Sequence, residues 1–275
     1  MVKTLKYATI SQIFIENLLF FDDSTSESKE NCIKFCNDLG ITYLPDKNCN
    51  KCYELIDQNF EERSLNEVQT CSPNDLIFDS STLDKFGTEN NKDNVLFVIE
   101  KELIVGVVHI VDYNKDFIYY EFYKLLFQFE KKLREYLKIS NQTNEDFIRW
   151  VEIKASEEAK KDKDSYWKNT LFNLKVGNIE AEKKRKNLGQ FQTFNFSDLL
   201  RFAEEKGYFK AKRQKIVDLR NWVAHSRDIV KQDKNEPFNE LGEPQPLYHF
   251  DGLKNFIDDA TYFFDIFREI ESKFT

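Results

Sequence analysis

The sequence predicts an α+β protein, in which an N-terminal α/β pair over residues 1–114 is followed by an all-α bundle over residues 115–275. Short helical and β-rich segments occur twice in the same order in the first half. From residue 117 onward, apolar residues recur at spacings of three and four, the period of an amphipathic helix. The net charge also changes, from −10 in residues 1–114 to +2 in residues 115–275.

The first copy of the α/β order begins with a helix over Ser28–Leu39, whose apolar residues are spaced helically and which Gly40 would stop. Ile41–Pro45 and Tyr53–Ile56 follow as two strands. Ser72–Asn74 contains turn residues. A short strand over Asp75–Phe78 follows. The second copy comprises a helix over Thr82–Phe86 that ends at Gly87, and two β-rich runs, Val95–Ile99 and Leu103–Val111.

Glu100-Lys101-Glu102 separates the last two runs, which predicts a hairpin. The order of helix, strand, turn and strand therefore occurs twice, with a repeat of about 50–55 residues. This repetition indicates one α/β module with pseudo-twofold symmetry.

Five helices are expected in the second half. They cover Phe117–Lys138, Asn144 to about Lys175, Phe196–Lys206, Lys212–Ala224, and a last helix from near Asp251 to Phe274. Asn195 or Ser197 would cap the third helix, and Asp251 is a good N-cap for the last. A loop with three prolines precedes the last helix.

The composition excludes several classes of protein. Apolar residues make up 41% of the chain, which excludes global disorder. No apolar stretch approaches the ~20 residues of a membrane span, and the N-terminus lacks the apolar region of a signal peptide. We therefore expect a soluble, cytoplasmic protein. The eight glycines form no phosphate-binding loop or dinucleotide-binding motif, and no G-x-S-x-G sequence occurs. The chain therefore lacks the signatures of ATPases, kinases, Rossmann dehydrogenases and α/β-hydrolases.

Residues 183–227 carry 12 basic and 4 acidic side chains, a net of +8. This charge fits either a solvated, lysine-rich face or a surface that binds a polyanion.

Arg220 and His225 lie five positions apart within this basic stretch. On an ideal helix this spacing separates two side chains by about 140°. To act on one phosphate, the helix must end between them, or a second subunit must complete the site. Histidine can take a proton from a ribose 2′-OH near neutral pH, and arginine can bind the phosphate bidentately. The alternative is a core-facing histidine with a surface arginine.

The string LRNWVAH over Leu219–His225 resembles the Arg-x(4–6)-His motif of ribonucleases in the HEPN family (higher eukaryotes and prokaryotes nucleotide-binding), with Asn221 as the polar residue after Arg220. Glu130 and Arg134 resemble a second family pattern, Glu-x-x-Leu-Arg. The resemblance covers about residues 117–275. It implies an all-α bundle and a homodimer whose facing motifs cut RNA without a metal, leaving a 2′,3′-cyclic phosphate. It also implies a toxin or an abortive-infection (antiviral-defence) effector, and such a toxin could have an antitoxin partner.

Residues 95–112 resemble the end of a CBS repeat, in which two strands end in Gly-x-x-Thr/Ser-x-x-Asp. Gly106 and Asp112 match, and His109 stands in place of the hydroxyl residue. The resemblance implies that Asp112 would accept hydrogen bonds from a ribose, so that the module could sense an adenine nucleotide. Gly40–Pro45 is similar to the Gly-Ile-x-x-x-Pro signature of a first copy, but the later motif is missing there. A dimerisation or scaffold module is the alternative.

The five cysteines include Cys49 and Cys52 in a C-x2-C arrangement, and Cys32 and Cys36 on one predicted helix. A zinc ribbon needs a second such pair, which the sequence lacks. We expect free thiols, no metal and no cofactor. His249 would be structural or would line an RNA cleft.

Two functions follow from these features. The first is a metal-independent HEPN-type endoribonuclease with catalytic residues Arg220, Asn221 and His225 and a CBS-like regulatory module. The second is a non-catalytic adenine-nucleotide sensor or dimer scaffold.

Overall fold

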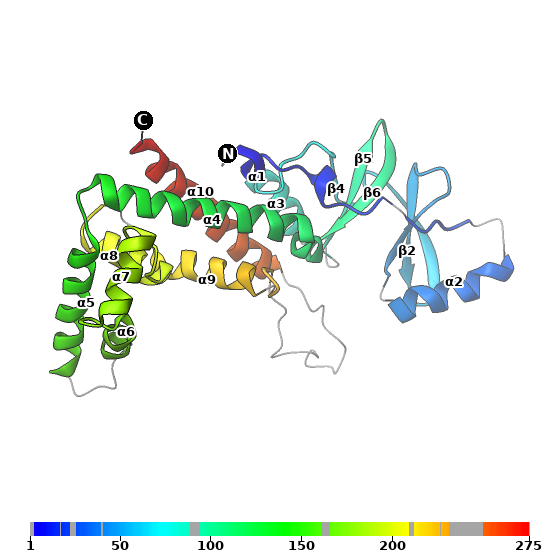
Figure 1. Cartoon of the computed structure of the whole chain (residues 1–275). Coiled ribbons are helices and arrows are strands. Elements are labelled where there is room, and N and C mark those ends of the chain that lie inside the picture. Colours follow the sequence, from blue (N-terminus) through cyan, green and yellow to red (C-terminus); the bar gives the residue numbers. More distant parts are fainter. Residues whose placement is uncertain are drawn as a thin grey trace. The chain divides into compact units, whose positions relative to one another are not determined.

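The computed structural model describes residues 3–16, 18–22, 26–39, 41–88, 94–160, 166–208, 212–225, 227–230 and 250–274 (Figure 1). The fold is mixed α+β, with small sheets in the N-terminal half and helices in the C-terminal half. Compactness divides the chain into unit 1, Met1–Phe122 with Trp222–Thr261, and unit 2, Tyr123–Asn221 with Tyr262–Thr275. This division is discontinuous along the chain, whereas the predicted boundary at residue 115 follows a change in secondary structure.

Unit 1 contains two three-stranded sheets. Its elements are α1 (Lys3–Lys6), η1 (Ile10–Gln12), α2 (Ser26–Leu39), β1 (Tyr43–Pro45), β2 (Lys51–Ile56), β3 (Asn59–Ser64), β4 (Thr70–Cys71), α3 (Ser80–Phe86), β5 (Val95–Glu100), β6 (Leu103–His109) and η2 (Ile110–Asn114). The β1-β2-β3 sheet is antiparallel throughout. In the second sheet, β4 is parallel to β5 and β5 is antiparallel to β6.

The predicted repetition of element order is present in unit 1. Helix α2 connects Phe21 to β1, and Phe21 forms a parallel bridge with Asp46 at the end of that strand. Helix α3 connects β4 to the parallel β5 in the same way. An antiparallel strand, β2 or β6, then follows in each copy.

Two predictions about the strands were wrong or incomplete. Asp75–Phe78 is not a strand, because the Ser72 N–H donates to Asp75 Oδ2 at 3.1 Å and the Asp75 N–H donates to the Ser72 carbonyl at 3.0 Å, which makes a turn. The parallel strand lies earlier, at β4. Strand β3 was not predicted, because its sequence NFEERS is largely polar and exposed and has no apolar alternation.

The hairpin between β5 and β6 has a two-residue turn. Lys101 and Glu102 both have left-handed backbone conformations, with φ of 51° and 65°. Two such residues in sequence are typical of the type I′ turn that fits the twist of paired strands. Glu100 therefore belongs to β5, and β6 ends at His109 rather than at Val111.

The two sheets share a hydrophobic cluster built on Cys52, Phe97 and Ile104. Tyr43 packs edge-on against Phe97, with ring centroids 5.8 Å apart. The Ile104 N–H donates to the Cys49 carbonyl at 2.7 Å, which joins the second sheet to the turn of the first.

The helical part has more helices than the five predicted. They are α4 (Asp116–Ile139), α5 (Asn144–Ala159), α6 (Tyr166–Leu174), α7 (Ile179–Leu188), α8 (Phe196–Glu205), α9 (Arg213–Ala224) and α10 (Phe250–Ser272). The predicted helix from Asn144 to Lys175 is therefore two helices. The predicted inward faces of α4, α8, α9 and α10 are buried.

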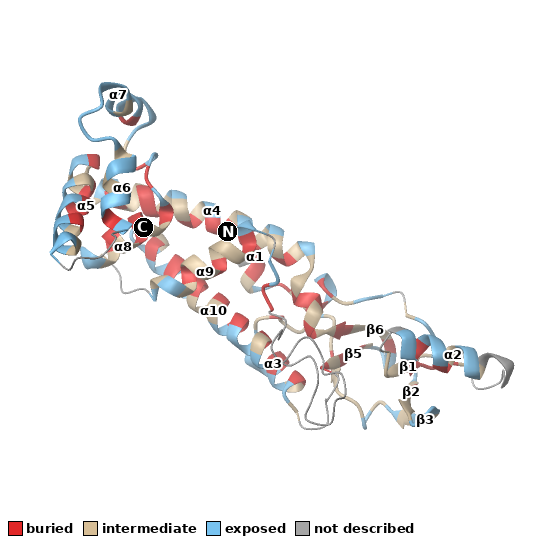
Figure 2. Ribbon diagram, turned by 90° about the horizontal axis from the view of Figure 1, so that it is seen from below, coloured by how far each residue is buried: buried red, intermediate tan, exposed pale blue. Residues whose placement is uncertain are grey.

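Helix α7 was not predicted, because it has no apolar stripe and is exposed along its length apart from Ala181 and Arg185 (Figure 2). Asn178 caps it by accepting a hydrogen bond from the Ala181 N–H at 3.0 Å. Asn195 caps α8, as predicted. Asp251 is not an N-cap, because α10 already begins at Phe250. The three prolines, Gly40 and His249 lie outside the described residues.

The core of unit 2 is rich in aromatic residues. Phe129 of α4 packs edge-on against Phe196, Phe263 and Phe267, at centroid distances of 5.9, 5.3 and 5.7 Å. Trp150 of α5 packs against Trp167 of α6 at 4.8 Å. Among the described residues, no helix combines the length and apolar character needed to cross a membrane.

Candidate functional site

The predicted catalytic residues lie at the C-terminal end of α9. Arg220 and Asn221 occupy its last two turns, and His225 is the first residue after the helix. Arg220 Nη1 donates a long hydrogen bond of 3.4 Å to Asn221 Oδ1. Both side chains are half-buried, whereas His225 is exposed. The helix therefore ends between Arg220 and His225, which is one of the two conditions under which both side chains could act on one phosphate.

The chain that follows His225 is tied to η2 and α4 within unit 1. The Arg227 N–H donates to the Trp222 carbonyl at 2.9 Å, a hydrogen bond over five residues of the kind that closes a Schellman terminus. The Tyr119 hydroxyl donates to the Arg227 carbonyl at 2.7 Å. These bonds hold the backbone on both sides of His225.

Asn114 binds the same segment at three points. Its Oδ1 accepts hydrogen bonds from the N–H groups of Ile229 and Val230, both at 2.9 Å, and its Nδ2 donates to the Val230 carbonyl at 3.0 Å. Ile229 and Val230 are buried. No pattern in the sequence points to Asn114 or Tyr119, because both lie more than 100 positions from their partners.

Glu130 and Arg134 form an internal clamp in unit 2. Arg134 Nη2 pairs with Glu130 Oε1 at 2.7 Å. Arg134 also donates to the carbonyls of Phe191, at 3.0 Å from Nε, and Phe194, at 3.3 Å from Nη2. Arg134 is only 9% exposed. Its guanidinium therefore holds the turn before α8 and is not presented to solvent.

Gly106, His109 and Asp112 lie close together at the end of β6, but their polar groups are engaged within the chain. Asp112 Oδ2 accepts from the His109 N–H at 2.7 Å, and its Oδ1 pairs with Lys115 Nζ at 3.1 Å. His109 Nδ1 accepts from the Val111 N–H at 3.1 Å. A Cβ atom at position 106 would overlap the Phe14 ring and the Ile15 carbonyl. Gly106 therefore allows the segment with Phe14 and Ile15 to pack directly against the backbone of β6.

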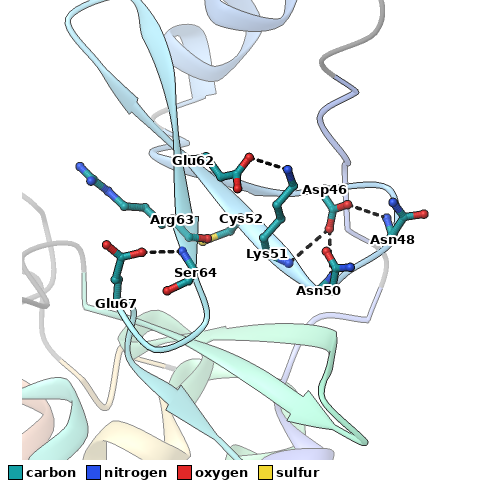
Figure 3. Close-up of polar contacts among 9 residues, drawn as sticks. All are labelled: Asp46, Asn48, Asn50, Lys51, Cys52, Glu62, Arg63, Ser64 and Glu67. Carbon is teal, nitrogen blue, oxygen red and sulfur yellow. Dashed lines mark hydrogen bonds and ion pairs between the residues drawn. The ribbon is translucent and has the colours of Figure 1, made fainter.

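The turn that carries Cys49 is organised by a buried carboxylate (Figure 3). Asp46 accepts backbone N–H groups from Asn48, Asn50 and Lys51 at 3.0–3.3 Å. Burial raises the pKa of Cys52 to about 12, and that of Cys49 is raised by the same cause. Both thiols therefore stay protonated near neutral pH, a state that does not favour metal binding.

Two adjoining cavities of unit 2 were not predicted from the sequence. The Asp198 cavity, of about 340 Å³, lies between α6 and the N-terminus of α8 and is lined by Phe147, Tyr166, Asn169, Thr170, Asn173, Leu174, Thr193, Phe194, Asn195 and Asp198. The Lys184 cavity, of about 410 Å³, is lined by Asn173, Leu174, Lys175, Asn178, Glu180, Ala181, Lys184, Arg185 and Thr193. No sequence motif marks them, because their walls come from separate segments.

Within the described part of the chain, no group of three or more histidine, cysteine, aspartate or glutamate residues could hold a metal ion. The exposed lysines Lys183, Lys184 and Lys186 place part of the basic stretch on the surface of α7. Models of known protein families, curated proteins and solved structures give no match to this chain.

Proposed function

We propose that the protein is a metal-independent endoribonuclease in which His225 transfers protons, Arg220 binds the scissile phosphate and Asn221 orients the arginine. The observation that carries the proposal is the end of α9 between Arg220 and His225. An exposed histidine directly after the helix can turn away from the direction that a continued helix would impose. The Schellman-type bond from Arg227 to Trp222 supports this view, because it fixes the backbone around the histidine.

The chemistry requires only side chains of these types. His225, as a general base, takes the proton of a ribose 2′-OH, and the 2′-oxygen attacks the adjacent phosphorus. The bond from phosphorus to the 5′-oxygen breaks, and that oxygen receives a proton from the imidazolium. The products are a 2′,3′-cyclic phosphate and a free 5′-OH. Arg220 stabilises the negative charge that develops on the phosphate oxygens.

The surroundings of the motif favour an anionic substrate. The motif lies within residues 183–227, whose net charge is +8. Cationic side chains bind RNA phosphates by charge and release of counterions, without regard to sequence. In the same proposal the protein acts as a homodimer and as a toxin or antiviral-defence effector, regulated by its N-terminal module. The alternative, an adenine-nucleotide sensor, has less support because both carboxylate oxygens of Asp112 are engaged within the chain.

The test is cleavage of a fluorescent RNA by wild type, His225→Ala and Arg220→Ala, all in EDTA. We expect wild type to cut and each variant to lose at least about 100-fold in rate, because general acid–base catalysis contributes about 10²–10⁴-fold. Gln214→Ala, at an exposed and uncharged residue of the same helix, is the matched control and should cut normally. Equal cleavage by all the proteins, or loss of wild-type activity in EDTA, would show the proposal to be wrong.

A further inference from the structure

We propose that the Asp198 and Lys184 cavities together form a nucleotide-binding site that takes a guanine base against Asp198 and its phosphate against Lys175 and Lys184. The two cavities share Asn173, Leu174 and Thr193 as a common wall. One nucleotide could therefore occupy both. Their volumes are within the usual range of small-molecule sites, about 300–1,000 Å³.

Asp198 provides the acceptors for the base. The residue is only 5% exposed, and its Oδ1 accepts a hydrogen bond from the Tyr166 hydroxyl at 2.6 Å. Its Oδ2 accepts none from the described residues. Asp198 is one of the residues that line the cavity, and because Tyr166 already engages Oδ1 we assign Oδ2 to the ligand.

The surroundings of Asp198 favour a neutral ligand over a cation. Burial raises the pKa of Asp198, and the positive charges of Arg201 and Arg213 oppose that rise. The same two arginines would repel an ammonium or guanidinium group in the cavity. The remaining polar lining consists of amides and hydroxyls, including Asn169, Thr170 and Asn195. Such a lining suits a heterocycle with several donors and acceptors.

Guanine is the nucleobase that fits a carboxylate best. Its N1–H and N2–H groups point the same way from one edge, and the two oxygens of a carboxylate can accept both. Adenine, cytosine and uracil each present a single donor next to acceptors on that edge. Tyr166, which is 53% exposed and hydrogen-bonded to Asp198, lies at the rim, where its ring can stack on a base.

The second cavity provides the positive charge for a phosphate. Lys175 and Lys184 line it, and neither forms an ion pair with another described residue. Arg185 lies in the same wall, but it is buried and its Nη1 donates to the Leu174 carbonyl. One carboxylate, Glu180, faces the same space. Two lysines against one glutamate leave a net positive charge beside the base cavity.

The experiment is titration calorimetry of the full chain with the 5′-monophosphates of guanosine, adenosine, cytidine and uridine. We expect guanosine monophosphate to bind at least about fivefold more tightly than the others, because one good bidentate contact discriminates by about 5- to 150-fold. Asp198→Asn should abolish the preference, since an amide replaces one acceptor with a donor. Lys184→Ala should weaken guanosine monophosphate but not guanosine, whereas the adjacent Lys183→Ala should change neither.

Asn173→Trp tests the site without disturbing buried residues, because Asn173 is exposed and lines both cavities. The bulky ring should block binding while leaving the melting temperature unchanged. Equal affinities for the four nucleotides, no detectable binding at millimolar concentration, or unchanged binding by Asn173→Trp would each overturn the proposal. Tighter binding of a guanine-containing tetranucleotide than of the monophosphate would assign the site to RNA; the reverse would assign it to a free nucleotide. His225→Ala should bind normally, so the nuclease proposal can fail separately.

Discussion

Arg134 binds three backbone carbonyls, those of Glu130, Phe191 and Phe194, and the Glu130 carboxylate with a single guanidinium. The Phe191 and Phe194 carbonyls that it binds belong to the turn before α8, and Phe194 lines the Asp198 cavity. Phe191 itself has a left-handed backbone, with φ of 65°. The fork of donors on Arg134 therefore stabilises a turn that is unfavourable for a phenylalanine.

We expect Arg134→Lys to lower the free energy of unfolding by about 1–3 kcal/mol for each carbonyl left without a donor. A lysine has one point charge in place of the planar fork and cannot reach both carbonyls while it pairs with Glu130. Urea unfolding followed by circular dichroism would measure the loss. Arg149→Lys, an exposed arginine on α5, is the matched control and should change stability by less than about 0.5 kcal/mol. Equal stability of the two variants would contradict this role of Arg134.

At the scale of elements, the segment after α9 depends on η2 and α4 for its position. Asn114→Ala removes three hydrogen bonds to Ile229 and Val230. We expect RNA cleavage to fall about 10- to 100-fold, because misplacing a catalytic group by about 1 Å can have an effect of that size. Amide exchange at Ile229 and Val230 should become faster in parallel.

Asn114→Asp provides a graded comparison for the same element. An aspartate keeps the oxygen that accepts from Ile229 and Val230 but loses the donor to the Val230 carbonyl. Its activity and amide exchange should therefore lie between those of wild type and Asn114→Ala. Asn187→Ala, on the exposed face of α7, should leave both unchanged. Normal activity of Asn114→Ala, despite faster amide exchange, would show that the segment does not position His225.

The elements themselves were predictable where local signals are strong. The hairpin β5–β6 and helices α4, α8, α9 and α10 each have a clear apolar period. Helix α7 and strand β3 have none, because they are almost wholly exposed or polar. The clamp of Arg134 and the walls of the two cavities join residues up to 60 positions apart, and a single sequence does not encode such pairings in its local spacing.

At the scale of the whole molecule, the net charge differs between the two predicted halves of the chain. The full chain has a net charge of −8, but the segment with the Arg220–His225 motif has +8. The acidic residues are concentrated in the first 114 positions. Under the proposed function, the charge that attracts RNA is therefore that of the segment with the motif and not that of the whole chain.

The proposed homodimer predicts how cleavage depends on protein concentration. If both copies of the motif are needed for one site, the rate per protomer should fall as the enzyme is diluted below the dissociation constant of the dimer. Sedimentation equilibrium would measure that constant independently. The two measurements should give the same midpoint, because dissociation of the dimer is then the cause of lost activity.

Mixing provides the sharper form of this prediction. A tenfold excess of inactive His225→Ala protein, equilibrated with wild type, should capture most wild-type protomers in mixed dimers. Such dimers hold one intact histidine, so cleavage should fall several-fold if the site is composite. Excess Gln214→Ala protein, assayed after subtracting its own activity, is the control for competition unrelated to the motif. Unchanged cleavage in the presence of excess His225→Ala, with mixed dimers detected by sedimentation, would mean that each protomer carries a complete site.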